Sequence, residues 1–225
     1  MSQQADIEWR DGLVPVSTRF DDPYFSLDNG LAETTYVFLD GNDLPARFCD
    51  GFHIGELGFG TGLNLLAALH LWRKNGQTGR LHFTSFEAFP MAGDDMIAAQ
   101  AAFPMLSEIS AELAPYWQAG STAFDLPDLC FNLITGDARE TLPNWPGKAD
   151  AWFLDGFSPA KNPELWEPAL MAMVAEHTAP SGTAATYTAA GFVRRGLTDA
   201  GFDVQRRAGF GRKRHMTIAT FEGSP

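Results

Sequence analysis

The chain has 225 residues, of which 45% are hydrophobic and 20% are charged, and its formal net charge is −12 at pH 7. This composition predicts one large core and excludes a fibrous, disordered or disulfide-stapled chain. No apolar run approaches the roughly 20 residues that span a bilayer, and the polar residues 1–6 lack the basic-then-apolar pattern of a signal peptide. We therefore expect a cytoplasmic protein without a membrane partner.

The first 50 residues differ from the rest of the chain because they are rich in turn residues and contain one β-rich run, Thr34–Leu39. They predict a small β-containing N-terminal cap at residues 1–50, followed by a catalytic-sized domain at residues 51–225. The two cysteines, Cys49 and Cys130, have no metal-binding or redox spacing. We expect two reduced thiols and no metal site.

From residue 52 onward, strand-like runs alternate with helix-like segments, which predicts a parallel α/β sheet. The expected strands are 53–58, 81–87, 129–135, 150–155 and 183–188, and the expected helices are 62–73, 94–102, 138–142, 164–177 and 190–200. Two last strands, 202–207 and 214–221, lie close enough in sequence to form an antiparallel hairpin. A parallel sheet closed by such a hairpin is typical of the seven-stranded, Rossmann-like class I methyltransferase architecture.

A glycine turn follows the first of these strands. Glycines allow positive φ and bring backbone N–H groups against a ligand, and their G-x-G-x-G spacing differs from the G-x-G-x-x-G of dinucleotide sites. Glu56, inside the motif, would repel a pyrophosphate but favour a ligand with a cationic amino-acid end. The turn therefore predicts an S-adenosylmethionine site more than an NAD site. The expected cofactor contacts here are Glu56, Gly58, Phe59, Gly60, Thr61, Gly62 and Asn64.

Two acids at the ends of the following strands extend this prediction. Glu87 ends strand 81–87, where a carboxylate would accept hydrogen bonds from both hydroxyls of a ribose. Asp137 precedes Ala138 after strand 129–135, and it would either accept from an adenine amine or cap the following helix. The two roles are compatible at one helix N-terminus, so both stay open.

A second informative segment, Asp155–Pro163, follows the apolar strand 150–155. Its position brings Asp155 and Gly156 to the edge of the sheet where open α/β folds bind substrates, on a loop stiffened by proline. Phe157 would stack on a base. The alternatives are an Asp that only forms a turn and a Phe that belongs to the core.

Basic residues gather near the C-terminus although the whole chain is acidic. Between residues 194 and 215, seven basic residues stand against two acidic ones, a local charge of +5. This cluster predicts either a phosphate-binding patch or an ordinary solvated surface, and composition does not decide between them. The basic residues are Arg194, Arg195, Arg206, Arg207, Arg212, Lys213 and Arg214.

Five segments together resemble one family of enzymes. These segments are Asp155–Pro163, Thr188–Arg195, Gly209–Arg214, Phe20–Ser26 and Gly30–Phe38. They are similar to the tRNA 5-methylaminomethyl-2-thiouridine methyltransferase family, which comprises MnmD and the methyltransferase half of MnmC. The resemblance implies transfer of a methyl group from S-adenosylmethionine to the amine of 5-aminomethyl-(2-thio)uridine at the tRNA wobble position.

The resemblance also suggests roles for individual residues. It implies Asp155 as the catalytic group, with Tyr24, Phe157 and Lys161 as contacts to the substrate in the tRNA anticodon region. Arg194, Arg195, Arg212 and Lys213 are the expected phosphate contacts. Because the sequence ends at Pro225, we expect a separate enzyme to supply the aminomethyl precursor.

Three other functions compete with this reading. A small-molecule N-methyltransferase would explain the cofactor motif and the acidic composition but not the arginine cluster. A noncatalytic module that binds S-adenosylmethionine and a protein partner would also carry the glycine turn. An NAD-dependent oxidoreductase is disfavoured, because Glu56 would lie under its pyrophosphate.

Overall fold

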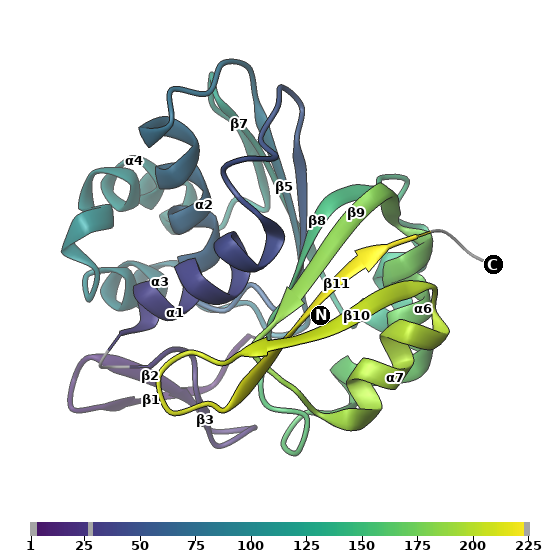
Figure 1. Ribbon diagram of the computed structural model, residues 1–225. Helices are drawn as coiled ribbons and strands as arrows, with labels where there is room; N and C mark the ends of the chain where they lie inside the picture. Colours follow the sequence, from purple (N-terminus) through teal and green to yellow (C-terminus); the bar gives the residue numbers. More distant parts are fainter. Residues whose placement is uncertain (1–3, 27–28, 223–225) are drawn as a thin grey trace.

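The computed structural model describes residues 4–26 and 29–222, so residues 1–3 of the polar N-terminal segment lie outside it. An eight-stranded sheet runs through the molecule with helices on both faces (Figure 1). Its strands are β4 (His53–Leu57), β5 (Leu81–Glu87), β6 (Ala123–Asp125), β7 (Leu129–Thr135), β8 (Ala149–Leu154), β9 (Thr178–Thr186), β10 (Phe202–Ala208) and β11 (His215–Phe221). Their order across the sheet is β10-β11-β9-β8-β4-β5-β7-β6.

The centre of this sheet is parallel and its edges are antiparallel. Strands β9, β8, β4, β5 and β7 pair in parallel, whereas β11 pairs antiparallel with both β9 and β10. The predicted mostly parallel sheet and C-terminal hairpin are thus confirmed, but the structure has eight strands in this sheet instead of the expected seven. The additional strand is β6, which pairs antiparallel with β7. It has only three residues and no fully buried side chain, so it is too short to show the alternating apolar pattern by which a strand is predicted.

Helices cover both faces of the sheet (Figure 1). Residues of α2 and α4 pack with Phe83 and Phe131 into one buried cluster, and α6 and α7 contribute Leu170 and Val193 to a second cluster. The helices are α1 (Gly30–Thr34), α2 (Leu63–Lys74), α3 (Gly93–Gln100), α4 (Ser107–Gln118), α5 (Ala138–Thr141), α6 (Pro168–Glu176) and α7 (Gly191–Asp199). None of the helices among residues 4–26 and 29–222 is both long and apolar enough to span a bilayer.

Two helical segments differ from expectation. The expected helix 164–177 divides into a 3-10 turn, Pro163–Trp166, and α6, because Glu167 precedes Pro168 and is extended at ψ 145°. Helix α4 was not predicted at all. It carries Pro115 in its interior, a residue that normally argues against a helix.

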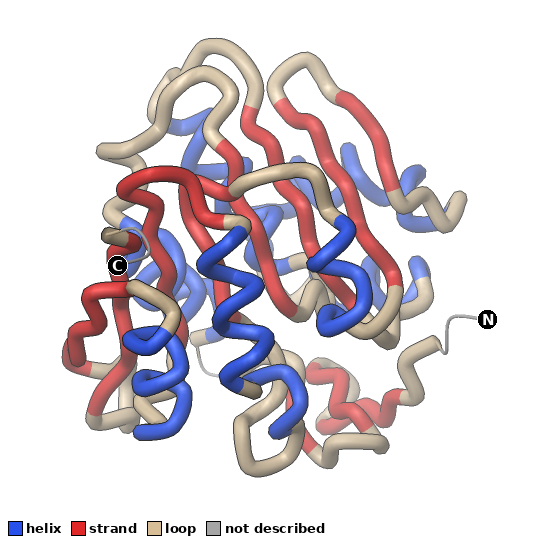
Figure 2. Tube along the Cα trace, turned by 90° about the vertical axis from the view of Figure 1, so that its right-hand side faces the viewer, coloured by secondary structure: helices blue, strands red, loops and turns tan. Residues whose placement is uncertain are grey.

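The N-terminal extension forms a separate three-stranded antiparallel sheet beside the end of the large sheet (Figure 2). Its strands are β1 (Ile7–Arg10), β2 (Val14–Ser17) and β3 (Asp22–Pro23). The expected β content is therefore present, but in a different segment.

The strand expected at Thr34–Leu39 is wrong, because this run is helical. It continues from α1 into a π-helical turn, Thr35–Leu39. Residues 30, 34, 37, 38 and 39 are buried, and the first four have the spacing of one helix face and not the alternation of a strand. The β propensity of the side chains is thus outweighed by burial against the core, where Val37 and Phe38 are 0% and 3% exposed.

Candidate active site

A cavity of about 1400 Å³ opens where the parallel strands end. Residues that follow β4, β5, β7, β8 and β9 line it, and so do residues of the N-terminal extension, of α1 and of the β10–β11 loop. In the sheet, β4 lies between β5 and β8, and the backbone N–H of Asp155 donates to the carbonyl of Leu57 at 3.1 Å. The glycine turn and the Asp155 loop are therefore neighbours at one edge, as open α/β sheets require of a ligand site.

The glycine turn has the backbone conformation that its sequence predicts. Gly58 and Gly60 have φ angles of +86° and +54°, which L side chains rarely adopt. A Cβ on Gly58 would lie 3.0 Å from the Cα of Gly156, and one on Gly60 would lie 3.1 Å from the ring of Tyr24. The turn therefore leaves no room for side chains between these neighbours, and its backbone faces the cavity.

Glu87 connects the end of β5 to this turn. Its Oε2 accepts a hydrogen bond from the backbone N–H of Gly60 at 3.1 Å, and its Oε1 accepts one from Phe89 at 2.8 Å. Burial raises the pKa of Glu87 above its usual range, and these backbone N–H groups oppose the shift. Each carboxylate oxygen keeps a lone pair beyond these bonds, so the predicted ribose contact fits the geometry and stays a prediction.

Asp137 does cap α5, which was one of its two predicted roles. Its Oδ1 accepts from the backbone N–H of Arg139 at 2.9 Å, and its Oδ2 lies 2.6 Å from the Nη2 of the same arginine. The arginine holds the pKa of Asp137 below its usual range. Asp137 and Ala138 also line the cavity, so contact with an adenine stays a prediction for both.

Glu56 lies behind the cavity wall. Its side chain is 0% exposed and accepts hydrogen bonds from Ser85 Oγ at 2.6 Å and from Asn64 Nδ2 at 2.9 Å. Burial raises the pKa of Glu56 well above its usual range. Neither Glu56 nor Gly62 is among the cavity-lining residues, whereas Phe59, Thr61 and Asn64 are. Direct contact of Glu56 and Gly62 with a cofactor stays a prediction.

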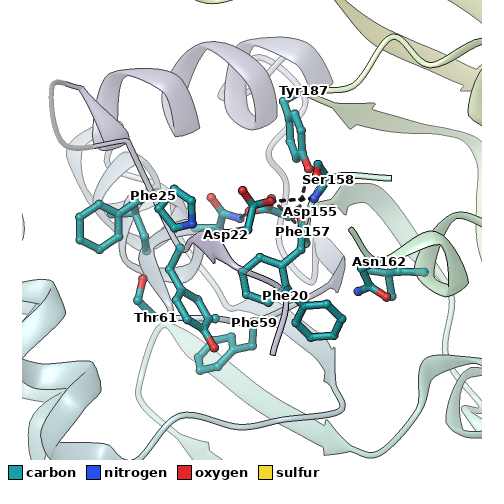
Figure 3. Close-up of a pocket in the computed structure, with 18 of the residues that line it drawn as sticks. Phe20, Asp22, Phe25, Phe59, Thr61, Asp155, Phe157, Ser158, Asn162 and Tyr187 are labelled. Atoms are coloured by element: carbon teal, nitrogen blue, oxygen red, sulfur yellow. Dashed lines mark hydrogen bonds between the residues drawn. The ribbon is translucent and has the colours of Figure 1, made fainter. Parts of the chain in front are cut away.

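Asp155 is held on both carboxylate oxygens. Oδ2 accepts from Asn64 Nδ2 at 2.8 Å, and Oδ1 accepts from the backbone N–H of Gly156 at 2.8 Å. Burial raises the pKa of Asp155 to about 6, against these hydrogen bonds. The hydroxyl of Tyr187 donates to the carbonyl of Gly156 at 2.8 Å, and Figure 3 shows it directed at this loop. The carboxylate is therefore fixed in place at the cavity wall.

Aromatic rings from the N-terminal extension cover the Asp155 loop. The ring of Phe157 stacks on Phe20 with centroids 4.8 Å apart and meets Tyr24 edge-on at 5.0 Å. Figure 3 shows Phe20 and Phe157 beside each other. Tyr24 and Phe157 both line the cavity, as expected of substrate contacts.

Lys161 does not line the cavity. It donates to the carbonyl of Asp21, and its Nζ lies 3.6 Å from a carboxylate oxygen of Asp22. The Oδ2 of Asp22 also accepts from the backbone N–H of Ser158 at 3.1 Å. Lys161 therefore connects the Asp155 loop with the N-terminal extension. Its contact with substrate stays a prediction.

The C-terminal basic cluster is divided between two places. Arg212 and Lys213 line the cavity from the β10–β11 loop, whereas Arg194 and Arg195 lie on α7 and are not among the lining residues. The Nζ of Lys213 lies 2.6 Å from Glu33 Oε1. The four residues were predicted as one group, and the structure brings only two of them to the cavity.

The comparisons with known proteins decide the family. Residues 104–222, more than half of the chain, match the model of a family described as S-adenosyl-L-methionine-dependent methyltransferase. The chain belongs to this methyltransferase family. The predicted class I methyltransferase fold is confirmed, and S-adenosylmethionine is the cofactor.

Relatives of the methyltransferase cover nearly all of its sequence. It is 48% identical over 96% of its length to the "tRNA 5-methylaminomethyl-2-thiouridine biosynthesis bifunctional protein MnmC" of Caulobacter sp. strain K31 and 46% identical over 99% to that of Pseudomonas aeruginosa strain UCBPP-PA14. It covers 38% and 36% of these two proteins, less than two fifths of their length. The crystal structure of MNMC2 from Aquifex aeolicus aligns over 99% of this chain and 72% of its own, with a TM-score of 0.73 and 28% identity.

The cavity of the methyltransferase fits this cofactor. The carboxylates of Glu87 and Asp155 line the cavity together with the glycine turn, where the backbone is not covered by side chains. Acceptors placed this way suit hydroxyl groups and an ammonium group better than phosphates. Among residues 4–26 and 29–222, no three His, Cys, Asp or Glu side chains are grouped so that they could hold a metal ion.

Sequence reasoning missed several residues that line the cavity of the methyltransferase. Glu33 was passed over because it directly precedes Thr34–Leu39, a run that was read as a strand, so its place in helix α1 was not expected. Tyr187 follows β9, and the rule that singled out Asp155 at a strand end would also have found it. Arg10 and Arg19 line the cavity from the extension, and no motif marks them.

Proposed function

We propose that this methyltransferase transfers a methyl group from S-adenosylmethionine to the amine of 5-aminomethyl-(2-thio)uridine at the wobble position of tRNA, giving 5-methylaminomethyl-(2-thio)uridine. The observation that carries this proposal is the match over 94–99% of the chain, at 44–48% identity, to proteins named for the biosynthesis of this nucleoside. The chain spans less than two fifths of the length of those in Caulobacter sp. strain K31 and Pseudomonas aeruginosa strain UCBPP-PA14, so the substrate and the partners are part of this proposal.

The cofactor-binding side of the cavity is proposed to be the glycine turn with the ends of β5, β7 and β8. When bound, S-adenosylmethionine supplies an electrophilic methyl group, whose bond to sulfur breaks with both electrons left on sulfur as the amine lone pair forms the new N–C bond. We propose that Glu87 binds the ribose hydroxyls and that Asp155, with Asn64, binds the amino-acid end. The other proposed contacts are Glu56, Gly58, Phe59, Gly60, Thr61, Gly62, Asp137, Ala138 and Gly156.

Asp155 is the proposed catalytic residue. A free alkylamine has a pKa near about 10, so most of it arrives as an ammonium ion and must lose a proton before it can attack. An ionised carboxylate stabilises this ammonium, while desolvation in the cavity has the opposite effect. We propose that Asp155 orients the ammonium ion and accepts its proton, which frees the lone pair for attack, and that the N–C bond then forms to give a methylated ammonium ion while Asp155 releases its proton to water.

The substrate side of the cavity offers planar rings and positive charge. Tyr24, Phe157 and Arg212 line the cavity, and we propose that the two rings contact the uracil base and that Arg212 binds a backbone phosphate. Arg10 and Arg19 line the same cavity from the N-terminal extension. We propose that these arginines bind the anticodon region, which would let an acidic protein bind RNA through one local patch.

A small-molecule N-methyltransferase is the second candidate, and the net charge of −12 favours it. The test is transfer of labelled methyl groups from S-adenosylmethionine to tRNA carrying 5-aminomethyl-2-thiouridine, compared with the free nucleoside at equal concentration. If the proposed function is correct, kcat/KM will be far higher on tRNA than on the free nucleoside. Equal values on both substrates would support the second candidate.

The proposed reaction also implies a partner activity. Methyl transfer uses an amine that is already present, so another enzymatic activity must supply the 5-aminomethyl group. A tRNA substrate further implies that the enzyme acts in the cytoplasm.

A further inference from the structure

The ammonium of Lys213 already has a carboxylate and an aromatic ring as partners at the cavity, so we do not treat it as a simple phosphate contact. Its Nζ lies 2.6 Å from Glu33 Oε1 and 4.2 Å from the centroid of the Tyr187 ring. The side chain of Glu33 is only 20% exposed, and that of Lys213 is 46% exposed. The ammonium of this half-exposed side chain thus contacts a carboxylate and an aromatic face at the wall of the cavity.

The same wall carries the proposed proton acceptor. Tyr187 contacts Lys213 through its ring, and its hydroxyl donates to the carbonyl of Gly156, the residue after Asp155, at 2.8 Å. The positive charge of Lys213 lowers the pKa of Asp155, and the negative charge of Glu33 raises it. Lys213, Glu33 and Asp155 therefore form one electrostatic group around Tyr187.

Other acidic groups face this site from neighbouring elements. Glu56 of β4 faces Asp155 through Asn64, and Asp22 of the extension faces Tyr187. Burial and the charge of Glu33 disfavour a negative charge at Asp155, and so would an ionised Glu56. The positive charge of Lys213 opposes these effects.

We infer that Lys213 is a positioning residue of the methyl-transfer site, whose ammonium, held by Glu33 and the Tyr187 ring, keeps the Asp155 carboxylate in the ionised form that accepts a proton. Glu33 fixes the ammonium and balances its charge, so a cationic substrate is not repelled from the cavity. The inference rests on the proposed role of Asp155 in the reaction.

The charge of the Asp155 carboxylate gives a direct test. Protein labelled with ¹³C in its aspartate carboxyl groups would be titrated by NMR without tRNA, and the Asp155 signal would be assigned by its loss in Asp155→Asn. We expect Lys213→Met to shift the midpoint of this signal to higher pH, because an opposite charge that favours the ionised carboxylate is lost. We expect Glu33→Gln to lower it, and the double variant to titrate near the wild type.

Two further variants separate charge from structure. Lys213→Arg keeps the cation and is expected to keep the wild-type midpoint, whereas Lys213→Gln, a second neutral variant, should behave as Lys213→Met. Lys148→Met is the control. Lys148 is exposed and directly precedes β8, whereas Asp155 follows the other end of the same strand. An unchanged Asp155 midpoint in folded Lys213→Met and Lys213→Gln would overturn the inference.

The kinetic readout distinguishes this role from phosphate binding. If Lys213 acts on Asp155, the acidic limb of kcat/KM for methyl transfer moves to higher pH in Lys213→Met. A phosphate contact would instead raise KM for tRNA at every pH and leave the limb in place, which would count against the inference. Because the NMR titration needs no tRNA, a failure of the proposed substrate would not be confused with a failure of this inference.

Discussion

The side-chain nitrogen of Asn64 donates a 2.8 Å hydrogen bond to the carboxylate of Asp155. The same nitrogen donates a 2.9 Å bond to Glu56, so both amide hydrogens are used. Asn64 is itself only 5% exposed and sits in the first turn of α2, directly after the glycine turn. One buried amide therefore fixes the proposed proton acceptor relative to the cofactor-binding turn.

Replacing this amide should affect stability and proton transfer together. Asn64→Ala removes one of the hydrogen-bond donors of each of two buried carboxylates, which we expect to reduce the free energy of unfolding by about 1–3 kcal/mol. It should also raise the pKa of Asp155, because this hydrogen bond favours the ionised form. Urea unfolding and the pH profile of kcat/KM measure the two effects. Asn75→Ala is the control, since the exposed Asn75 caps the other end of α2, and equal behaviour of the two variants would contradict this account.

The methylation rate should depend on the charge of Asp155. The carboxylate accepts a proton only when ionised, so kcat/KM should fall as the pH falls through the Asp155 pKa of about 6. Asp155→Asn should remove this acidic limb and reduce kcat by a factor on the order of 10²–10⁴, the range for loss of a general base. Calorimetry should still detect S-adenosylmethionine binding. A variant with wild-type kcat and an intact acidic limb would exclude Asp155 from proton transfer.

The contacts of Lys161 should matter for loop order more than for overall stability. Lys161→Met removes its contacts to Asp21 and Asp22, an exposed ion pair worth about 0–1 kcal/mol. We expect faster hydrogen exchange in residues 156–162 and a lower kcat/KM, because the loop that carries Phe157 loses its connection to the extension. Arg80→Met removes a similar exposed ion pair with Asp125 and serves as the control. Unchanged exchange in Lys161→Met would show that these contacts do not order the loop.

The basic residues near the C-terminus should contribute unequally to tRNA binding. Arg212 lines the cavity, so Arg212→Glu should weaken binding and reduce the slope of log K against log salt by about 0.7–0.9 if it contacts one phosphate. Arg194→Glu, on α7, is expected to have a smaller effect. Fluorescence anisotropy across a salt series measures both. A larger effect of Arg194→Glu would place the RNA-binding surface on α7.

Much of the sheet could be predicted because its signals are local. The strand before Gly58 and the strand before Asp155 are apolar runs that end in a glycine or an acid, and both lie where the sequence indicates. The segment Thr34–Leu39 could not be read this way, since its β-branched and aromatic residues favour a strand while the core that it packs against selects a helix. Burial by distant parts of the chain overrode local propensity.

The candidate site could be predicted only in part. Glu87, Asp137 and Asp155 follow from one rule about strand ends, and all three line the cavity. Arg10, Arg19 and Glu33 come from the extension and α1, and their place depends on how those segments fold over the sheet. The sequence also grouped Lys213 with Arg194 and Arg195, although its pairing with Glu33 spans 180 positions along the chain.

The most direct test of the proposed function is mass spectrometry of the wobble nucleoside. Purified protein would be incubated with S-adenosylmethionine and tRNA that carries 5-aminomethyl-2-thiouridine, with Asp155→Asn as the matched control. The account predicts that the wild-type protein converts this nucleoside to 5-methylaminomethyl-2-thiouridine, a gain of one methyl group, and that the variant converts it far more slowly. If the protein binds S-adenosylmethionine but the 5-aminomethyl-2-thiouridine gains no methyl group, the proposed function is wrong.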